Sequence, residues 1–194
     1  MFAVTQRLLL RPGWADDAQP LHSAIAHESV VQTLAQLPWP YTLDDARDFL
    51  SLPRGGEDPV FLILDRTQGR PVLVGGVGIH AAPGTGESEI GYWITPDCWG
   101  RGFATEAARA VVEIARHTLR LPRLTAYHFI DNPASGKVLR KIGFKPTGRI
   151  EPRWCEARQR DVPSIQFALD LTGEGDAEGD PDMRFADTQT RLAA

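Results

Sequence analysis

The most informative segment of the chain reads Cys98-Trp99-Gly100-Arg101-Gly102-Phe103-Ala104-Thr105-Glu106-Ala107, between a predicted strand and a predicted helix. Small residues at Gly100, Gly102 and Ala104 let the backbone approach a ligand closely. The helix that follows presents unpaired N–H groups at its positive end. The segment therefore predicts an anion-binding loop suited to phosphate or pyrophosphate; the alternative is a glycine-rich turn that binds nothing.

The residues after this loop continue as a helix. Apolar residues recur there at helical spacing, which predicts a helix of about four turns from about Ala104 to Arg120. The positions that form this apolar stripe are Ala104, Ala107, Ala108, Val111, Val112, Ala115 and Leu119.

Strands are expected on both sides of the loop and its helix, and the sum is a mixed sheet with helices, of the α+β or α/β class. From the N-terminus, the pattern predicts a strand at 5–11, two short helices within 15–34, an aromatic loop at 37–41 and a helix capped by Thr42. Next come antiparallel strands at 60–66, 71–80 and 88–95. Beyond the long helix lie a strand at 123–130, a helix at 133–142 that stops at Gly143, and strands at 143–150 and 164–171.

Composition predicts one globular domain with a short appendage, since 42% of the 194 residues are apolar and 24% are charged. Residues 172–194 hold six acids and two bases, which leaves 19 acids and 19 bases in residues 1–171. We therefore expect a neutral domain at 1–171 and an acidic tail at 172–194. The tail composition favours disorder; the alternative is an arm that docks on a neighbouring subunit.

The same composition excludes several classes of partner. A neutral domain without a Lys/Arg cluster lacks the positive surface charge that binds duplex nucleic acid or an anionic membrane. The sequence does not exclude a local basic groove. No apolar run approaches the roughly 20 residues that would span a bilayer, and the N-terminus lacks the features of a signal peptide. We expect a cytoplasmic protein.

The sequence also argues against a metal site and a dinucleotide site. Cys98 and Cys155 form no CxxC pair, so we expect reduced thiols, and the five histidines show no HExxH motif. Thr105 stands where a dinucleotide fingerprint needs Gly. No Lys-Ser/Thr pair follows the loop, as a Walker nucleotide-binding loop would require.

Four segments in register resemble the GNAT acetyltransferases. Residues 99–107 resemble the acyl-CoA pyrophosphate loop of the branch that includes the RimJ/RimL ribosomal-protein N-terminal acetyltransferases. Residues 5–11 are similar to that branch's opening strand, 89–93 to the strand before its loop, and 132–144 to its second CoA-contacting helix. The resemblance covers about Thr5 to Leu171.

This resemblance implies a GNAT fold, with a central sheet of about seven strands splayed between the fourth and fifth strands and with flanking helices. It implies an N-acetyltransferase that moves an acetyl group from acetyl-CoA to a primary amine in a ternary complex, without a metal, as a monomer or homodimer. The amine is a protein N-terminus or a small molecule. The alternatives are a non-catalytic CoA-binding or regulatory protein and an acyltransferase with a longer donor such as succinyl-CoA.

The resemblance also implies which residues contact CoA. Trp99 stands where the family often has Gln or Arg, which leaves the backbone cradle intact and removes one polar contact. Asn132 and Ser135 would contact the CoA arm, and Asn132 is alternatively the N-cap of the helix opened by Pro133. The loop residues expected to bind CoA are Trp99, Gly100, Arg101, Gly102, Phe103, Ala104 and Thr105.

Acetyl transfer to an amine requires a route for the amine proton and a proton for the departing thiolate. Ser135 is the candidate acid, because the tyrosine common in the family is replaced here by Leu139. Alternatively, Ser135 is only a hydroxyl residue in the first turn of the helix and has no catalytic role. Glu89 is the candidate base, directly or through water, and alternatively a solvated acid at a strand end.

The acceptor side is predicted from aromatic and histidine residues. Trp39 and Tyr41 would wall the acceptor groove, and alternatively they pack between two helices. His80 is placed with them on the acceptor side. His80 and His128 are also lesser candidates for the proton acceptor, since a lone histidine is more often structural.

Overall fold

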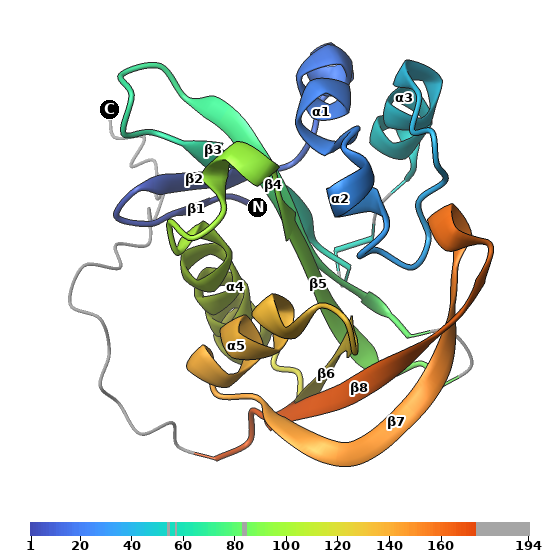
Figure 1. Cartoon of the computed structure of the whole chain (residues 1–194). Helices are drawn as coiled ribbons and strands as arrows, with labels where there is room; N and C mark the ends of the chain where they lie inside the picture. The colour runs from blue at the N-terminus through green and yellow to red at the C-terminus, as the bar shows by residue number, and fades with distance from the viewer. Residues whose placement is uncertain (54, 57, 83–84, 174–194) are drawn as a thin grey trace, which may run out of the picture.

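An eight-stranded mixed sheet forms the centre of the computed structural model, which describes residues 1–53, 55–56, 58–82 and 85–173 (Figure 1). The strand order across the sheet is β1-β2-β3-β4-β5-β6-β8-β7, and only β5 and β6 run parallel. The strands are β1 (Ala3–Val4), β2 (Leu8–Arg11), β3 (Val60–Asp65), β4 (Val72–Ala81), β5 (Ser88–Ile94), β6 (Arg123–Phe129), β7 (Lys145–Cys155) and β8 (Arg160–Asp170).

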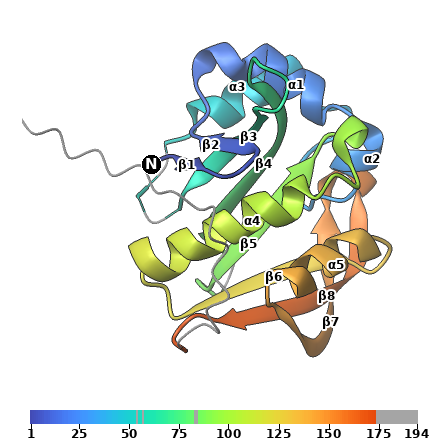
Figure 2. The ribbon, with the colours of Figure 1, turned by 90° about the vertical axis from the view of Figure 1, so that its left-hand side faces the viewer.

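Helices cover both faces of this sheet (Figures 1 and 2). One face, here the α1–α3 face, packs against α1 (Ala18–Ile25), α2 (Glu28–Val31) and α3 (Leu43–Ser51). The other, the α4/α5 face, packs against α4 (Phe103–Glu113) and α5 (Pro133–Lys141). Short turns complete the elements: η1 (Ala15–Asp17), η2 (Pro96–Cys98), a π-helical turn, η3 (Ile114–Thr118), and η4 (Glu156–Arg158).

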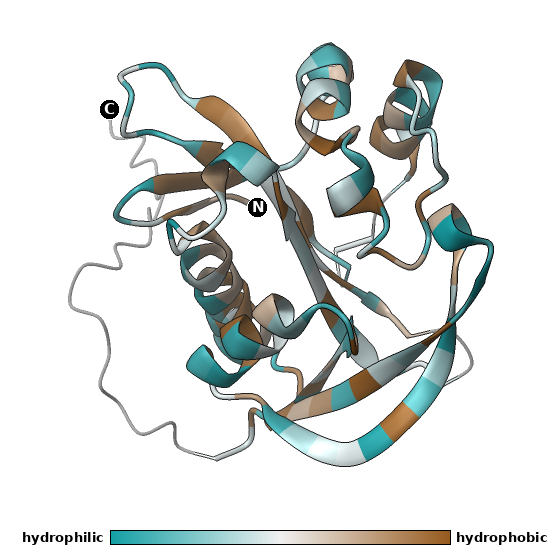
Figure 3. Cartoon of the chain, in the orientation of Figure 1, coloured by the Kyte–Doolittle hydropathy of each residue, from teal (hydrophilic) through white to brown (hydrophobic). Residues whose placement is uncertain are grey.

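Apolar residues on both sides of β3 explain why the sheet is covered twice. Phe61 and Ile63 belong to the core under α4 and α5, whereas Leu62 and Leu64 belong to the core under α1 and α3. A continuous apolar run of this kind is typical of a strand buried on both faces. Figure 3 shows apolar residues concentrated in the central strands, while the edge strand β7 is mostly polar and exposed.

The sheet is split at its parallel pair. Strands β5 and β6 share a single registered pair, Glu89 with Thr125, and the Thr125 hydroxyl donates to Ser88 O at 3.2 Å beside it. Past this point the two strands diverge toward their C-terminal ends. The predicted opening between the strands at 88–95 and 123–130 is therefore confirmed, and we call it the seam.

The fold differs from the sequence prediction at its two ends. The sheet has eight strands instead of about seven, because the first residues form a hairpin in which Ala3 pairs with Leu10. Strands β7 and β8 run beyond the predicted 143–150 and 164–171. Pro152 and Pro163 argue against strands in the sequence, but they are register partners here, and β7 is an edge strand, where proline is tolerated.

The helices agree more closely with the prediction. Thr42 caps α3 as expected, since its hydroxyl accepts from Asp45 N at 3.2 Å and the Asp45 carboxylate accepts from Thr42 N at 2.7 Å. The long helix was expected to reach Arg120, but α4 ends at Glu113 and continues as a π-helical turn to Thr118.

The predicted acidic tail can be compared with the structure only in part. Its residues from 174 onward lie outside the described residues. The last described strand ends at Asp170, and the domain boundary at residue 171 stays a prediction.

The lack of a side chain at Gly136 lets α5 pack closely against the sheet. A Cβ atom at this position would lie 2.6 Å from His128 Nε2 and 3.2 Å from two ring carbons. The ring is held in place, because its Nδ1 lies 2.8 Å from Phe129 O and its centroid is 5.4 Å from that of Phe167. His128 is therefore a buried packing residue on the α4/α5 face, not an exposed proton acceptor.

The Gly136→Ala substitution tests this packing. In an unconstrained helix the change stabilises by about 1 kcal/mol, but the collision with His128 should instead lower the free energy of unfolding by about 1–3 kcal/mol. Gly56→Ala is the control, because nothing lies within 4 Å of its Cβ position. Equal denaturant midpoints for Gly136→Ala and wild type would show that α5 is not seated on the His128 ring.

Candidate active site

The loop before α4 has the geometry of an anion cradle. Gly100 and Gly102 have φ values of +75° and +80°, and Gly102 is the N-cap residue of α4. Within the described part of the chain, no protein group accepts a hydrogen bond from the amides of residues 100–105. Trp99 lies at the edge of the cradle with 52% of its surface exposed, and its Nε1 donates to Ile94 O at 2.7 Å.

Two arginines support this cradle from beneath. The buried ring of Phe103 lies between the guanidinium carbons of Arg7 and Arg101, at 4.8 and 4.4 Å from its centroid. Arg7 also donates to Arg101 O at 2.9 Å and pairs with the Glu106 carboxylate at 2.7 Å. Of the predicted CoA contacts, Phe103 thus offers only its backbone, whereas Arg7 adds a positive charge that the sequence prediction missed.

The second predicted CoA segment opens α5. Asn132 Oδ1 accepts from Ser135 N at 3.4 Å and Pro133 follows as the first helical residue, so the expected capping role of Asn132 is confirmed. Whether Asn132 also contacts CoA stays a prediction.

Ser135 faces a tyrosine from the other side of the seam. The Tyr92 hydroxyl on β5 donates to Ser135 O at 3.0 Å and lies 2.9 Å from Ser135 Oγ. Burial raises the pKa of Tyr92 to about 12, against the opposing effect of the Ser135 hydrogen bond. Leu139, where the family's tyrosine is missing, is buried in the core. The Tyr92 hydroxyl thus contacts the first turn of α5 from strand β5.

Glu89 lies on the opposite face of β5 and is not a solvated acid. Its side chain is 9% exposed and accepts two hydrogen bonds from Arg153 of β7, at 2.9 and 2.7 Å. His80 Nε2 lies 3.7 Å from the same carboxylate. Burial would raise the pKa of Glu89, but the hydrogen bonds to His80 and Arg153 outweigh it and hold that pKa below its ordinary value.

Arg153 was outside the sequence prediction, because the strand there was expected to end at residue 150. Its guanidinium carbon lies 3.4 Å from the centroid of the Tyr127 ring on β6. The ion pair with Glu89 therefore crosses from β7 to β5 over the two intervening strands, β6 and β8. Only the observed register of β7 and β8, with Arg153 opposite Val162, brings these groups together.

The two predicted aromatic residues of the acceptor wall separate in the structure. Trp39 remains 40% exposed. Tyr41 is 5% exposed and its ring stacks on His22 with centroids 6.4 Å apart. Burial, with a smaller effect of the Asp45 charge, raises the pKa of Tyr41 to about 12. Tyr41 thus packs in the core, as in the alternative reading of this residue, and a role of Tyr41 or Trp39 at the acceptor stays a prediction.

The tip of the β7–β8 hairpin is hydrogen-bonded to the segment between α2 and α3. Glu156 N donates to Ala35 O at 2.8 Å, and Arg158 Nε donates to Gln32 O at 2.8 Å. Arg158 also pairs with Asp131, directly after β6. The segment between α2 and α3 is thereby tied to the far half of the sheet.

The remaining sequence predictions concern the two cysteines, a metal site and a membrane-spanning helix. Cys98 and Cys155 are free and buried. Among the described residues, no three His, Cys, Asp or Glu side chains gather as a metal site would require. No helix in the described ranges combines the length and apolar character needed to cross a bilayer.

The seam thus separates two sets of groups. Free backbone amides, two guanidinium groups and the Ser135 hydroxyl lie on the α4/α5 face, whereas Glu89 and His80 lie on the α1–α3 face. An anionic carrier on one side and an amine on the other could meet in the gap between β5 and β6.

The chain matches the family model of the acetyltransferase (GNAT) domain over residues 7–145. It therefore belongs to the GNAT acetyltransferase family, whose co-substrate is acetyl-CoA. Similar proteins in this family are named N-acetyltransferases.

Two similar proteins come from Bacillus subtilis (strain 168), and both are named uncharacterized N-acetyltransferases. YoaA is 43% identical over 77 residues, which cover 39% of this chain and 44% of YoaA. YnaD is 27% identical over 148 residues, which cover 76% of this chain and 85% of YnaD. The match with YoaA thus spans less than half of that protein.

Solved structures share the fold at lower identity. A GNAT-family acetyltransferase from Bacillus anthracis has a TM-score of 0.75 and 24% identity, over 89% of this chain and 100% of that one. RimL, a ribosomal L7/L12 α-N-protein acetyltransferase solved with coenzyme A, has a TM-score of 0.71 and 19% identity, over 88% and 98% of the chains. These TM-scores establish the common fold.

Gly102→Val is expected to weaken acetyl-CoA binding by at least about 10-fold in a calorimetric titration, because a branched side chain would stand in the cradle and strain a positive φ. The fold should survive, since among the described residues, apart from the two adjoining ones, the only atom within 4 Å of the new Cβ is Arg7 Nη2, at 3.5 Å. Gly69→Val is the matched control, with φ +79° and nothing within 4 Å of its Cβ. Equal affinities in the two folded variants would exclude the cradle as the CoA site.

Proposed function

We propose that the chain acetylates a primary amine, of a protein N-terminus or a small molecule, within a ternary complex formed at the seam. One observation carries this proposal: the cradle and Ser135 lie on one side of the divergence of β5 and β6, while Glu89 and His80 lie on the other. The two reactants would enter from opposite faces, so neither must leave before the other binds.

The observed residues suit the pyrophosphate of acetyl-CoA. Amides of residues 100–105 without acceptors among the described residues provide donors, next to Arg7 and Arg101, which pair with Glu106 and Asp65. Asn132 would add a contact to the CoA arm from α5. When bound, acetyl-CoA supplies an activated acyl group, and the protein contributes position and proton transfer.

Ser135 would give its proton to the sulfur as the carbon–sulfur bond breaks. Its oxygen then needs stabilisation, which the Tyr92 hydroxyl can provide at 2.9 Å. Because the pKa of Tyr92 is about 12, this hydroxyl keeps its proton at neutral pH and stays a donor. We therefore assign Tyr92 as a positioning residue that acts through Ser135, with solvent reprotonating the serine.

On the acceptor side, Glu89 and His80 would act together. The lowered pKa of Glu89 makes its carboxylate a weak base, but it attracts an ammonium group and faces His80. The half-exposed His80 ring can take the amine proton directly or through water. One proton thus leaves the amine and one reaches the sulfur, and the products are an amide and free CoA.

The direct test of this function is release of CoA thiol from acetyl-CoA with a panel of amines, read with a thiol reagent and with mass spectrometry of the products. We expect release that requires both enzyme and amine. CoA binding without release over the whole panel would instead indicate a non-catalytic CoA-binding protein. Release only from succinyl-CoA would indicate a longer donor.

A double-mutant cycle tests the Ser135–Tyr92 pair. Ser135→Ala should lower kcat by about 10- to 1000-fold, the order expected for loss of one proton donor, with unchanged acetyl-CoA affinity. Tyr92→Phe keeps the ring and should lower kcat by about 10-fold. If Tyr92 acts through Ser135, the double variant should be no slower than Ser135→Ala alone. Multiplicative losses would show that the two hydroxyls act separately, and full activity of Ser135→Ala would remove Ser135 as the acid.

A further inference from the structure

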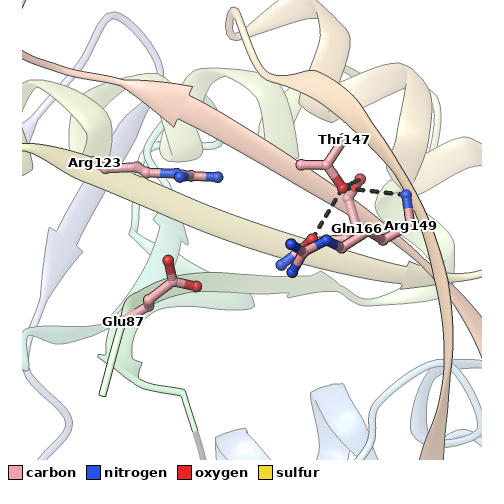
Figure 4. Close-up of a pocket in the computed structure, with 5 residues that line it drawn as sticks. All are labelled: Glu87, Arg123, Thr147, Arg149 and Gln166. Atoms are coloured by element: carbon pink, nitrogen blue, oxygen red, sulfur yellow. Dashed lines mark hydrogen bonds between the residues drawn. The ribbon is translucent and has the colours of Figure 1, made fainter. Parts of the chain in front are cut away.

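A polar hollow of about 260 Å³ lies on the sheet beside the seam, under the curved strand β7 (Figure 4). The register of β7 with β8 shifts between Pro146 and Ile150, and Gly148 in this bulge has a φ of +82°. The bulge bends β7 away from its neighbour, which opens the space. The lining residues are Glu87, Arg123, Thr147, Arg149 and Gln166.

The floor of the hollow is fixed by hydrogen bonds. Gln166 is 5% exposed, its Oε1 accepts from the Thr147 hydroxyl at 2.9 Å, and its Nε2 donates to the Tyr127 hydroxyl at 2.6 Å. Thr147 Oγ1 also accepts from Arg149 N at 3.3 Å. Figure 4 shows these groups converging on one side of the hollow, with Arg123 and Glu87 on the other.

Two arginines without an ion-pair partner among the described residues line the hollow. Arg123 and Arg149 both line it, and within the described residues neither has a carboxylate within 4 Å, unlike Arg7, Arg11 and Arg153. Asp170 is the register partner of Arg123, but its carboxylate accepts from Thr172 N and Oγ1 at 2.8 and 2.6 Å. The hydrogen bonds to Thr172 leave the negative charge of Asp170 in place, so the two guanidinium groups stand against two carboxylates, those of Glu87 and Asp170.

A chain of side-chain contacts links the hollow to the acceptor side of the seam. Gln166 donates a hydrogen bond to the Tyr127 hydroxyl, and the Tyr127 ring contacts the Arg153 guanidinium group. Arg153 in turn forms an ion pair with Glu89. Glu87 precedes Glu89 by two residues, or about 7 Å of extended chain. A ligand a few carbon atoms long could therefore reach from the seam to the hollow.

We propose that the hollow binds an oxyanion group, and that this group is the carboxylate of the acceptor amine. The inference rests on the proposed function, since the amine of that acceptor must reach Glu89 and His80. Guanidinium groups bind carboxylates through paired N–H donors, and a fixed floor reduces the cost of ordering the site. The acceptor is then an amino acid or peptide-like amine that carries a carboxylate a few bonds from its amino group.

The binding arm of the test uses inorganic phosphate, titrated by calorimetry into enzyme saturated with CoA so that the cradle is filled. We expect saturable binding that weakens by at least about 10-fold in Arg123→Gln and Arg149→Gln, the order expected for losing one charged partner. Arg70→Gln is the matched control, since it removes the same charge in the exposed turn between β3 and β4. Both hollow arginines are exposed, so their replacement leaves the core intact.

The kinetic arm compares ω-amino acids with alkylamines of equal length, such as 5-aminopentanoate with pentylamine. At the matching length we expect kcat/KM to favour the carboxylated amine by about 10-fold, and this ratio to fall toward one in Arg149→Gln but not in Arg70→Gln. Phosphate binding without this preference would support the oxyanion site and assign it to a free anion.

The proposal is overturned if phosphate binding and amine preference are the same in wild type, Arg123→Gln and Arg149→Gln. Should no amine be acetylated at all, the proposed function fails, while the phosphate titration still decides whether the hollow binds an anion.

Discussion

Beyond Glu89 and Thr125 the two central parallel strands stop pairing, and every other feature of the site follows from this break. A sheet interrupted at its centre must be held together by other contacts, because unpaired buried backbone groups are costly. Besides the Thr125 hydroxyl bond to Ser88 O, the described side chains supply two such contacts, one on each face. Tyr92 reaches from β5 to Ser135 of α5, and Glu89 of β5 pairs with Arg153 of β7.

These cross-seam contacts set the spacing of the reacting groups. A buried ion pair adds little net stability over apolar packing, but losing one partner leaves an uncompensated charge, at a cost of about 3–5 kcal/mol. The Glu89–Arg153 pair is therefore better understood as fixing where β7 lies. The docking of Glu156 and Arg158 on the segment before α3 has the same effect at the hairpin tip. The gap stays open while its walls stay rigid, as acyl transfer between two bound reactants requires.

Local signals and the family resemblance were sufficient to predict the cradle, the cap at Thr42 and the place of the split. The glycines that take positive φ, the Thr42–Asp45 box and Asn132-Pro133 each act within a few residues of themselves. The sequence could not indicate Arg153 or the hollow, because both depend on the register and the bulge of β7 against β8. Tyr92 lay within a recognised segment, but its partner is 43 residues away and on another element. Tyr41 carried the same aromatic signal as Trp39, and only tertiary packing separates the buried ring from the exposed one.

The central claim is that the break between β5 and β6 receives the thioester. A crystal structure of the chain with bound acetyl-CoA tests it most directly. The account predicts that the pyrophosphate lies against the amides that follow Trp99, that the sulfur lies beside Ser135 Oγ, and that the acetyl group points through the seam toward Glu89 and His80. A pantetheine arm that runs outside the seam, or a sulfur on the α1–α3 face away from Ser135, would contradict it.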